Sequence, residues 1–225
     1  MQASIVIAIA IATSLPGEPA RGADCVSKTL ERVEAGRPES AVTALKKGAR
    51  EGDERCKFIL GMWSLSGTGM AQDFVAGSRW LRDAAAAELP VAQANLGVLY
   101  ASGVGLTKDE EKAARWYRSA AEYGDPLGQV SLGAVTLLGI GVPKDPVEGY
   151  KWTSLAAAQG NQRARSQLDR MREAMTIDQI EQAKSQVAEF RPKERPRARS
   201  PTPQEILDAL GIFGPPGEYE RLFGF

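Results

Sequence analysis

The sequence of 225 residues contains no histidine and only two cysteines. Without histidine, the chain has no Ser-His or Cys-His nucleophile pair and no imidazole ligand for a metal. Two cysteines cannot build a four-thiolate zinc site. Lysine plus arginine and aspartate plus glutamate both total 28, so no net charge attracts the chain to nucleic acid. We therefore expect no catalytic residue, no metal, no cofactor and no nucleic-acid partner.

The apolar stretch near the N-terminus, residues 5–12, is well short of the roughly 20 residues that cross a bilayer. Pro16 and Gly17 interrupt it, and small residues at positions 20–23 offer cleavage sites, as in a secretory signal peptide. Because residues 1–4 lack lysine and arginine, either the true start lies upstream or the signal is weak. We expect a signal peptide at residues 1–23 and a periplasmic or secreted protein. Retention of the segment as an N-terminal anchor is the alternative.

Several residue types recur at intervals of 36 residues across three copies. They are Trp80, Trp116 and Trp152; Gly61, Gly97 and Gly133; Gly67, Gly103 and Gly139; Gly69, Gly105 and Gly141; and Asp73, Asp109 and Asp145. One period shared by several residue types is the signature of stacked two-helix units.

The middle copy, residues 91–125, shows why these residues recur. Its first helix, residues 92–100, contains Gly97, whose bare backbone allows a neighbouring helix to approach closely. Gly103 ends this helix because glycine accepts the left-handed conformation without steric cost. Asp109 then caps the second helix, which is predicted to bury Trp116 as its large apolar side chain among small alanines. The repeated Gly-x-Gly is thus a helix stop rather than a phosphate loop.

The chain resembles the Sel-one-like repeat (SLR) family, relatives of the tetratricopeptide repeat. The residues of the middle copy that meet the family pattern are Ala92, Leu96, Gly97, Tyr100, Gly103, Gly105, Asp109, Ala113, Trp116, Ala120, Ala121 and Gly124. The copies at residues 55–89 and 126–161 depart from it at a few positions: Ser64, Gly77 and Glu88, and Thr136 and Gly149. The resemblance implies an all-α, right-handed solenoid and a binding role rather than a reaction.

The same resemblance places the first helix of each repeat, the A helix, on the concave surface. The partner-binding residues it nominates are Ile59, Met62, Ser66, Asn95, Val98, Ser102, Ser131, Ala134 and Leu138. These side chains are mostly small and apolar, which suits a peptide segment or an amphipathic helix. Ordinary packing between helices is the alternative reading of each.

Three functions fit these observations. The first is a non-catalytic adaptor or regulator in the bacterial cell envelope, which binds a protein partner. The second is a scaffold for the assembly of envelope polysaccharide or peptidoglycan, which the sequence does not distinguish from the first. The third is a hydrolase acting on cell-wall or β-lactam substrates, a reading implied by cysteine-rich relatives and disfavoured here by the two cysteines. Oligomeric state is left open.

Residues 24–54 are interpreted as a degenerate opening repeat, with a second helix near residues 39–51. Its shorter loop brings Cys25 and Cys56 to nearly equivalent places on successive A helices, although they lie 31 residues apart. In an exported protein this predicts a disulfide, with two separate buried thiols as the alternative. Asp24, directly before Cys25, argues against a lipoprotein signal.

Residues 162–190 are predicted to form two capping helices, one spanning residues 162–174 and one starting after Thr176 and ending at Phe190. Residues 191–225 then read as a basic, proline-rich linker and a tail with apolar residues near its end. That tail either docks on the solenoid or a partner, or stays disordered. Membrane contact is expected only through this tail or an uncleaved signal.

Overall fold

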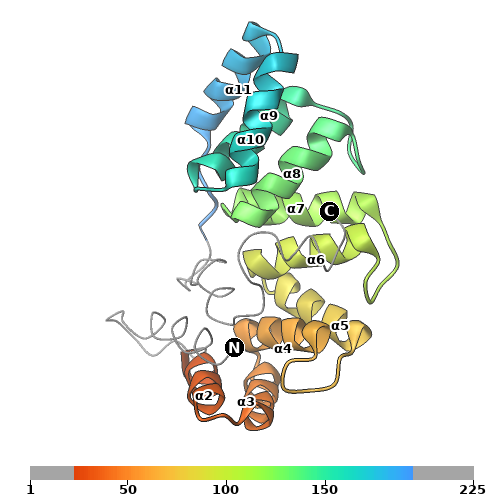
Figure 1. Cartoon of the computed structure of the whole chain (residues 1–225), viewed down its shortest axis with the longest axis vertical. Helices are drawn as coiled ribbons and strands as arrows, with labels where there is room; N and C mark the ends of the chain where they lie inside the picture. The colour runs from red at the N-terminus through yellow and green to blue at the C-terminus, as the bar shows by residue number, and fades with distance from the viewer. Residues whose placement is uncertain (1–22, 195–225) are drawn as a thin grey trace. The chain divides into compact units, whose positions relative to one another are not determined.

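The computed structural model describes residues 23–194, and in this part of the chain it contains ten α-helices and no strand. Labelled as in Figure 1, they are α2 (Ala23–Glu34), α3 (Pro38–Arg50), α4 (Glu54–Ser66), α5 (Phe74–Ala86), α6 (Pro90–Ser102), α7 (Glu110–Glu122), α8 (Pro126–Leu138), α9 (Pro146–Ala158), α10 (Gln162–Ala174) and α11 (Ile177–Glu189). Neighbours α2 and α3, α4 and α5, α6 and α7, and α8 and α9 pack as hairpins. The prediction of an all-α chain of helix-turn-helix units is confirmed.

The chain divides into two compact units. Among the described residues, unit one comprises residues 23–87 with 104–106, and unit two comprises residues 88–103 and 107–194. Unit one holds the hairpins α2–α3 and α4–α5. Unit two holds α6–α7 and α8–α9, and both α10 and α11 pack against α9 (Figure 1).

The predicted start and stop signals operate in all three regular repeats, which span α4 to α9. The A helices α4, α6 and α8 end at glycines in the left-handed conformation, with φ of 79°, 76° and 75°. The second helices, the B helices α5, α7 and α9, start after Asp73, Asp109 and Asp145, whose carboxylates accept hydrogen bonds from backbone N–H groups of the first turn. Local chemistry thus fixes both helix ends.

The glycine in the middle of each A helix is a packing position, as predicted. A Cβ atom added at Gly97 would lie 2.6 Å from the ring of Tyr117, and one added at Gly133 would lie 2.5 Å from the Thr153 hydroxyl. In unit one, the same addition at Gly61 would lie 2.8 Å from Leu81. The residues that these added Cβ atoms would meet, Leu81, Tyr117 and Thr153, are themselves 36 residues apart. The same type of contact therefore joins the A helix to the B helix in all three repeats.

The large buried side chain of the middle B helix is Tyr117, and the prediction that gave this role to Trp116 is wrong. Tyr117 is buried against Gly97, whereas Trp116 is only half-buried. Trp80 is also half-buried, and Trp152 is buried. On a helix, adjacent residues point about 100° apart, so a one-residue error in the facing position changes which side chain meets the glycine.

The two ends of the described chain depart slightly from expectation. The predicted opening hairpin is present as α2 and α3, and Thr176 and Gln179 form the predicted capping box of α11. Residues 191–194, assigned to the linker, instead belong to unit two, since the Lys193 N–H donates to the Glu122 carbonyl oxygen over 2.8 Å. The remaining linker and tail residues, and residues 1–22 of the predicted signal peptide, lie outside the described residues, whereas Ala23 is the first residue of α2.

The close contact at Gly97 yields a first prediction. Gly97→Ala should lower the free energy of unfolding by up to roughly 2 kcal/mol, because an overpacking cost of up to about 3 kcal/mol exceeds the gain of about 1 kcal/mol in helix propensity. Urea unfolding followed by circular dichroism measures this change. In a Tyr117→Leu background the same substitution should cost less, since the ring that it meets is gone. An equal cost in both backgrounds would contradict the assigned contact.

A buried carboxylate sits in the turn between α7 and α8. Asp125 is the N-cap of α8, and its Oδ1 accepts the Gly128 N–H over 2.7 Å. Its Oδ2 is buried without a hydrogen-bond partner among the described residues. Burial raises the pKa of Asp125 from its ordinary value of 3.8 to about 7.

The raised pKa predicts an unusual pH dependence of stability. The contribution of Asp125 is fully present below pH 3.8 and is lost as the pH rises through about 7, because the folded state favours the protonated carboxyl. Relative to Asp125→Asn, the wild-type protein should therefore gain up to roughly 4 kcal/mol of unfolding free energy between pH 8 and pH 4. Urea unfolding across this range measures the difference, and Asp145→Asn, at an exposed N-cap, controls for the loss of a capping charge. Parallel profiles for wild type and Asp125→Asn would rule out a buried charge here.

Candidate partner-binding surface

Two of the three nominated residues in unit one are inside the fold. Ile59 and Met62, on α4, are buried. Ser66, the last residue of α4, is exposed, and its hydroxyl lies 2.7 Å from the Thr68 hydroxyl. Of the three nominated residues in this unit, only Ser66 presents its side chain to an incoming partner.

The nominated residues of α6 are also largely covered. Asn95 is 4% exposed, and its Nδ2 donates to the Val91 carbonyl oxygen over 2.8 Å. Val98 is buried, and the half-buried Ser102 hydroxyl donates to the Val98 carbonyl oxygen over 2.8 Å. The Asn95 amide and the Ser102 hydroxyl therefore donate hydrogen bonds within their own helix.

All three nominated residues of α8 are at least partly accessible. Ser131 and Ala134 are half-buried, and Leu138, at the end of the helix, is 64% exposed. Ser131 makes a hydrogen bond with Tyr117, whose pKa is raised by burial. Binding at the nine residues stays a prediction, and in unit two its accessible part is the face of α8 that ends at Leu138.

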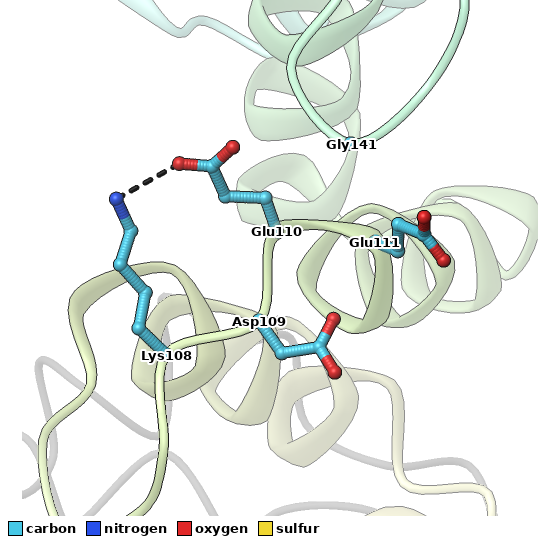
Figure 2. Close-up of a pocket in the computed structure, with 5 residues that line it drawn as sticks. All are labelled: Lys108, Asp109, Glu110, Glu111 and Gly141. Carbon is cyan, nitrogen blue, oxygen red and sulfur yellow. Dashed lines mark ion pairs between the residues drawn. The ribbon is translucent and has the colours of Figure 1, made fainter.

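A shallow depression of about 610 Å³ lies at the start of α7. Its lining residues are Lys108, Asp109, Glu110, Glu111 and Gly141 (Figure 2). A Cβ atom on Gly141 would lie 2.1 Å from the Glu110 carbonyl oxygen, so only glycine lets this loop rest on the helix start.

Three of the four charged residues that line this depression make ion pairs. Lys108 Nζ lies 2.8 Å from a Glu110 carboxylate oxygen, the pair drawn in Figure 2. The Lys112 ammonium, 2.6 Å from Asp109 Oδ2, lowers the pKa of that carboxyl through its hydrogen bond. In the described part of the chain, no cluster of three or more candidate ligands could hold a metal ion. The depression offers neither a metal site nor an unpaired acid–base couple.

The sequence reading missed a polar network between α7 and α9. Both terminal guanidinium nitrogens of Arg118 donate to the Glu148 carboxylate, at 2.5 and 3.2 Å, and the Trp152 indole N–H donates to the same carboxylate over 3.1 Å. Burial raises the pKa of Glu148, but the hydrogen bonds from Arg118 and Trp152 outweigh it and lower the pKa overall. The available signal was Glu148 itself, which replaces Ala76 and Lys112 of the other repeats.

Two features relate to the predicted export of the protein, namely its cysteines and the length of its helices. Cys56 is fully buried on α4, and the described chain has no free cysteine. The side chain of Cys25 lies outside the described residues, so the predicted disulfide stays a prediction. None of the helices in residues 23–194 is long and apolar enough to span a bilayer.

Comparison with known proteins gives a consistent result. The Sel1 repeat model matches residues 55–89, 90–125 and 126–161. A Sel1 repeat protein from Oxalobacter formigenes is 44% identical, with a TM-score of 0.53, over 56% of this chain and 96% of that one. The protein c5321, a protective antigen of uropathogenic Escherichia coli with an SLR fold, is 33% identical, with a TM-score of 0.63, over 68% of this chain. This chain spans only 33% of c5321. No curated protein matches significantly.

Proteins built from these repeats generally mediate protein–protein interactions and are typically non-catalytic. The three matched ranges contain the helix stops, N-caps and packing glycines described above. With three matched repeats, an α-solenoid fold and a relative 44% identical across nearly its whole length, the chain belongs to the Sel1 repeat family.

Proposed function

We propose that this protein is a non-catalytic adaptor of the bacterial cell envelope that binds a peptide or protein partner on the A-helix face of its repeats. Family membership supports an interaction role. The apolar segment followed by small residues near the N-terminus supports export.

The observation that carries the proposal is the accessible face of α8. Leu138 is a large apolar side chain that is 64% exposed, on the same face as the half-buried Ser131 and Ala134. An apolar anchor beside small residues is the arrangement by which a groove takes an amphipathic helix or an extended peptide. In this proposal Leu138 is the anchor, and the small side chains let the partner backbone come close.

Affinity capture from envelope extract tests this surface. With wild-type protein as bait, we expect a retained partner, and with Leu138→Asp we expect at least tenfold less of it, because a carboxylate would be buried in an apolar contact. Ile177→Asp is the matched control, since Ile177 is 79% exposed on α11, away from the A-helix face. Equal capture by both variants and the wild type would remove α8 as the binding surface.

A bait that ends at Glu194 separates the solenoid from the tail. The truncation keeps Lys193, which packs in unit two. Retention of the partner by this bait is expected if the repeats bind it. A partner captured only by the full-length bait would place the binding site beyond residue 194 and contradict the proposal.

We also propose that the protein is exported with Cys25 and Cys56 joined in a disulfide. Cys25 belongs to α2 and Cys56 to α4, and these two helices contact each other. A closed loop of about thirty residues would stabilise the fold by roughly 3 to 4 kcal/mol in the chain-entropy model. The disulfide would tie the degenerate first repeat to the first regular one.

Reductant should therefore lower the unfolding free energy of the wild-type protein by roughly 3 kcal/mol, whereas Cys25→Ala should not respond to reductant. In protein isolated from envelope fractions and denatured without reductant, a maleimide reagent should find no free thiol. Two reactive thiols in that sample would contradict the disulfide. Recovery of the protein in the cytoplasmic fraction alone would contradict export.

A further inference from the structure

Residues 190–193, near the end of the described chain, cross the B helices of unit two instead of leaving them. Phe190 follows α11 in an extended conformation, with φ of −63° and ψ of 130°. Its side chain contacts α9, and three residues later Lys193 contacts α7. The segment therefore spans two neighbouring repeats with one contact on each.

The aromatic end of this contact is built on Trp152. The Phe190 ring meets the Trp152 ring edge to face, with centroids 5.3 Å apart and planes at 78°. Lys151 Nζ lies 4.6 Å from the Trp152 centroid and 5.7 Å from that of Phe190, within cation–π range of both. The hydrogen bond from the Trp152 indole to Glu148 fixes the ring in place. The Trp152 ring, which forms the aromatic seat for Phe190, is thus positioned by Glu148 and Lys151 and does not need Phe190 to hold it.

The basic end is built on the last turn of α7. The Lys193 N–H donates to the Glu122 carbonyl oxygen over 2.8 Å, which satisfies an acceptor that the helix end leaves without an intrahelical donor. Lys193 Nζ donates to the Glu122 carboxylate over 2.5 Å and lies 6.0 Å from the Tyr123 ring centroid.

Proline fills the space between these two ends. Pro192 lies over Gly124, where an added Cβ would be 3.5 Å from the proline Cβ. Gly124 has φ of 84°, so it provides a turn without a side chain for the proline to rest on. Proline also limits the conformational freedom that an extended ligand loses on binding.

The repeat fold does not require the two acidic residues at this surface, Glu122 and Glu148. Position 122 is alanine in the other two repeats, at Ala86 and Ala158, and position 148 corresponds to Ala76 and Lys112. The seat combines a main-chain acceptor, an aromatic anchor, a flat site for proline and a carboxylate. Those are the elements by which proteins recognise an extended peptide.

We propose that the B-helix surface formed by Glu122, Tyr123, Gly124, Lys151 and Trp152 is a second peptide-binding site. Its ligand is an extended segment with the order aromatic, any residue, proline, lysine. The chain's own residues 190–193 occupy it in cis, and a segment of the same chemistry binds in trans when they are released. The site is on the B helices and is independent of the A-helix surface proposed above.

The test uses the full chain with Phe190→Ala and Lys193→Ala, which releases the cis segment and leaves no charge at position 193 to pair with residue 122. The probe is a fluorescein-labelled peptide with the sequence of residues 187–196, followed by fluorescence anisotropy. We expect saturable binding to the released variant, with an affinity at least tenfold higher than to the wild type, whose site is occupied. Adding Glu122→Lys to the released variant should abolish binding.

A charge exchange provides the specificity control. A peptide that carries glutamate in place of Lys193 should bind the released variant at least tenfold more weakly, and should bind again when Glu122→Lys is present. Lys184→Glu, at an exposed position of α11, should leave peptide binding unchanged. Failure of the released variant to bind the peptide, with its helical content intact by circular dichroism, would overturn the proposal.

Hydrogen exchange tests the cis contact directly on the wild-type protein. The Lys193 amide should exchange at least tenfold more slowly than in the free peptide, because it donates to the Glu122 carbonyl oxygen. Phe190→Ala should remove most of that protection. Exchange of the wild-type amide at the rate of the free peptide would also overturn the proposal.

Discussion

The close approach of the two helices in each repeat is the constraint on which the rest of the structure depends. A helix of ordinary side chains packs 8 to 10 Å from its neighbour, and a central glycine permits the shorter end of that range. At Gly97 the space of the missing side chain is filled by Tyr117, and at Gly133 by Thr153. Once these contacts set the hairpin, the left-handed glycine at each A-helix end and the aspartate cap determine the loop that joins its helices.

Residues that keep the period build the fold, and residues that break it give unit two its particular chemistry. Glu148 interrupts the pattern and recruits Arg118 from the neighbouring B helix. Glu122 interrupts it again and meets Lys193, 71 positions further along the chain. Neither carboxylate is needed to close a hairpin, since the equivalent positions of other repeats do without them. Such departures are the places where a repeat protein acquires individual binding properties.

The helices could be predicted because their start and stop signals lie within a few residues of each other. Contacts between segments far apart in the sequence could not be predicted in this way. The helix Gln162–Ala174 and the capping box at Thr176 follow from residues within a few positions of each other. The choice between Trp116 and Tyr117 depended on the angle between two helices, which the period does not specify. The burial of Asn95 and Val98, and the contact between Lys193 and Glu122, depend on segments that meet only in the folded chain.

The two proposed surfaces differ in how readily a partner gains access. Leu138 is already exposed, so a partner there competes only with water. The seat at Trp152 and Glu122 is occupied by a segment joined directly to α11, whose effective concentration is in the millimolar range or above. A free peptide of equal intrinsic affinity must exceed that concentration to displace it. The A-helix face therefore suits a partner bound continuously, and the B-helix seat suits one that binds only after residues 190–193 have been pulled away.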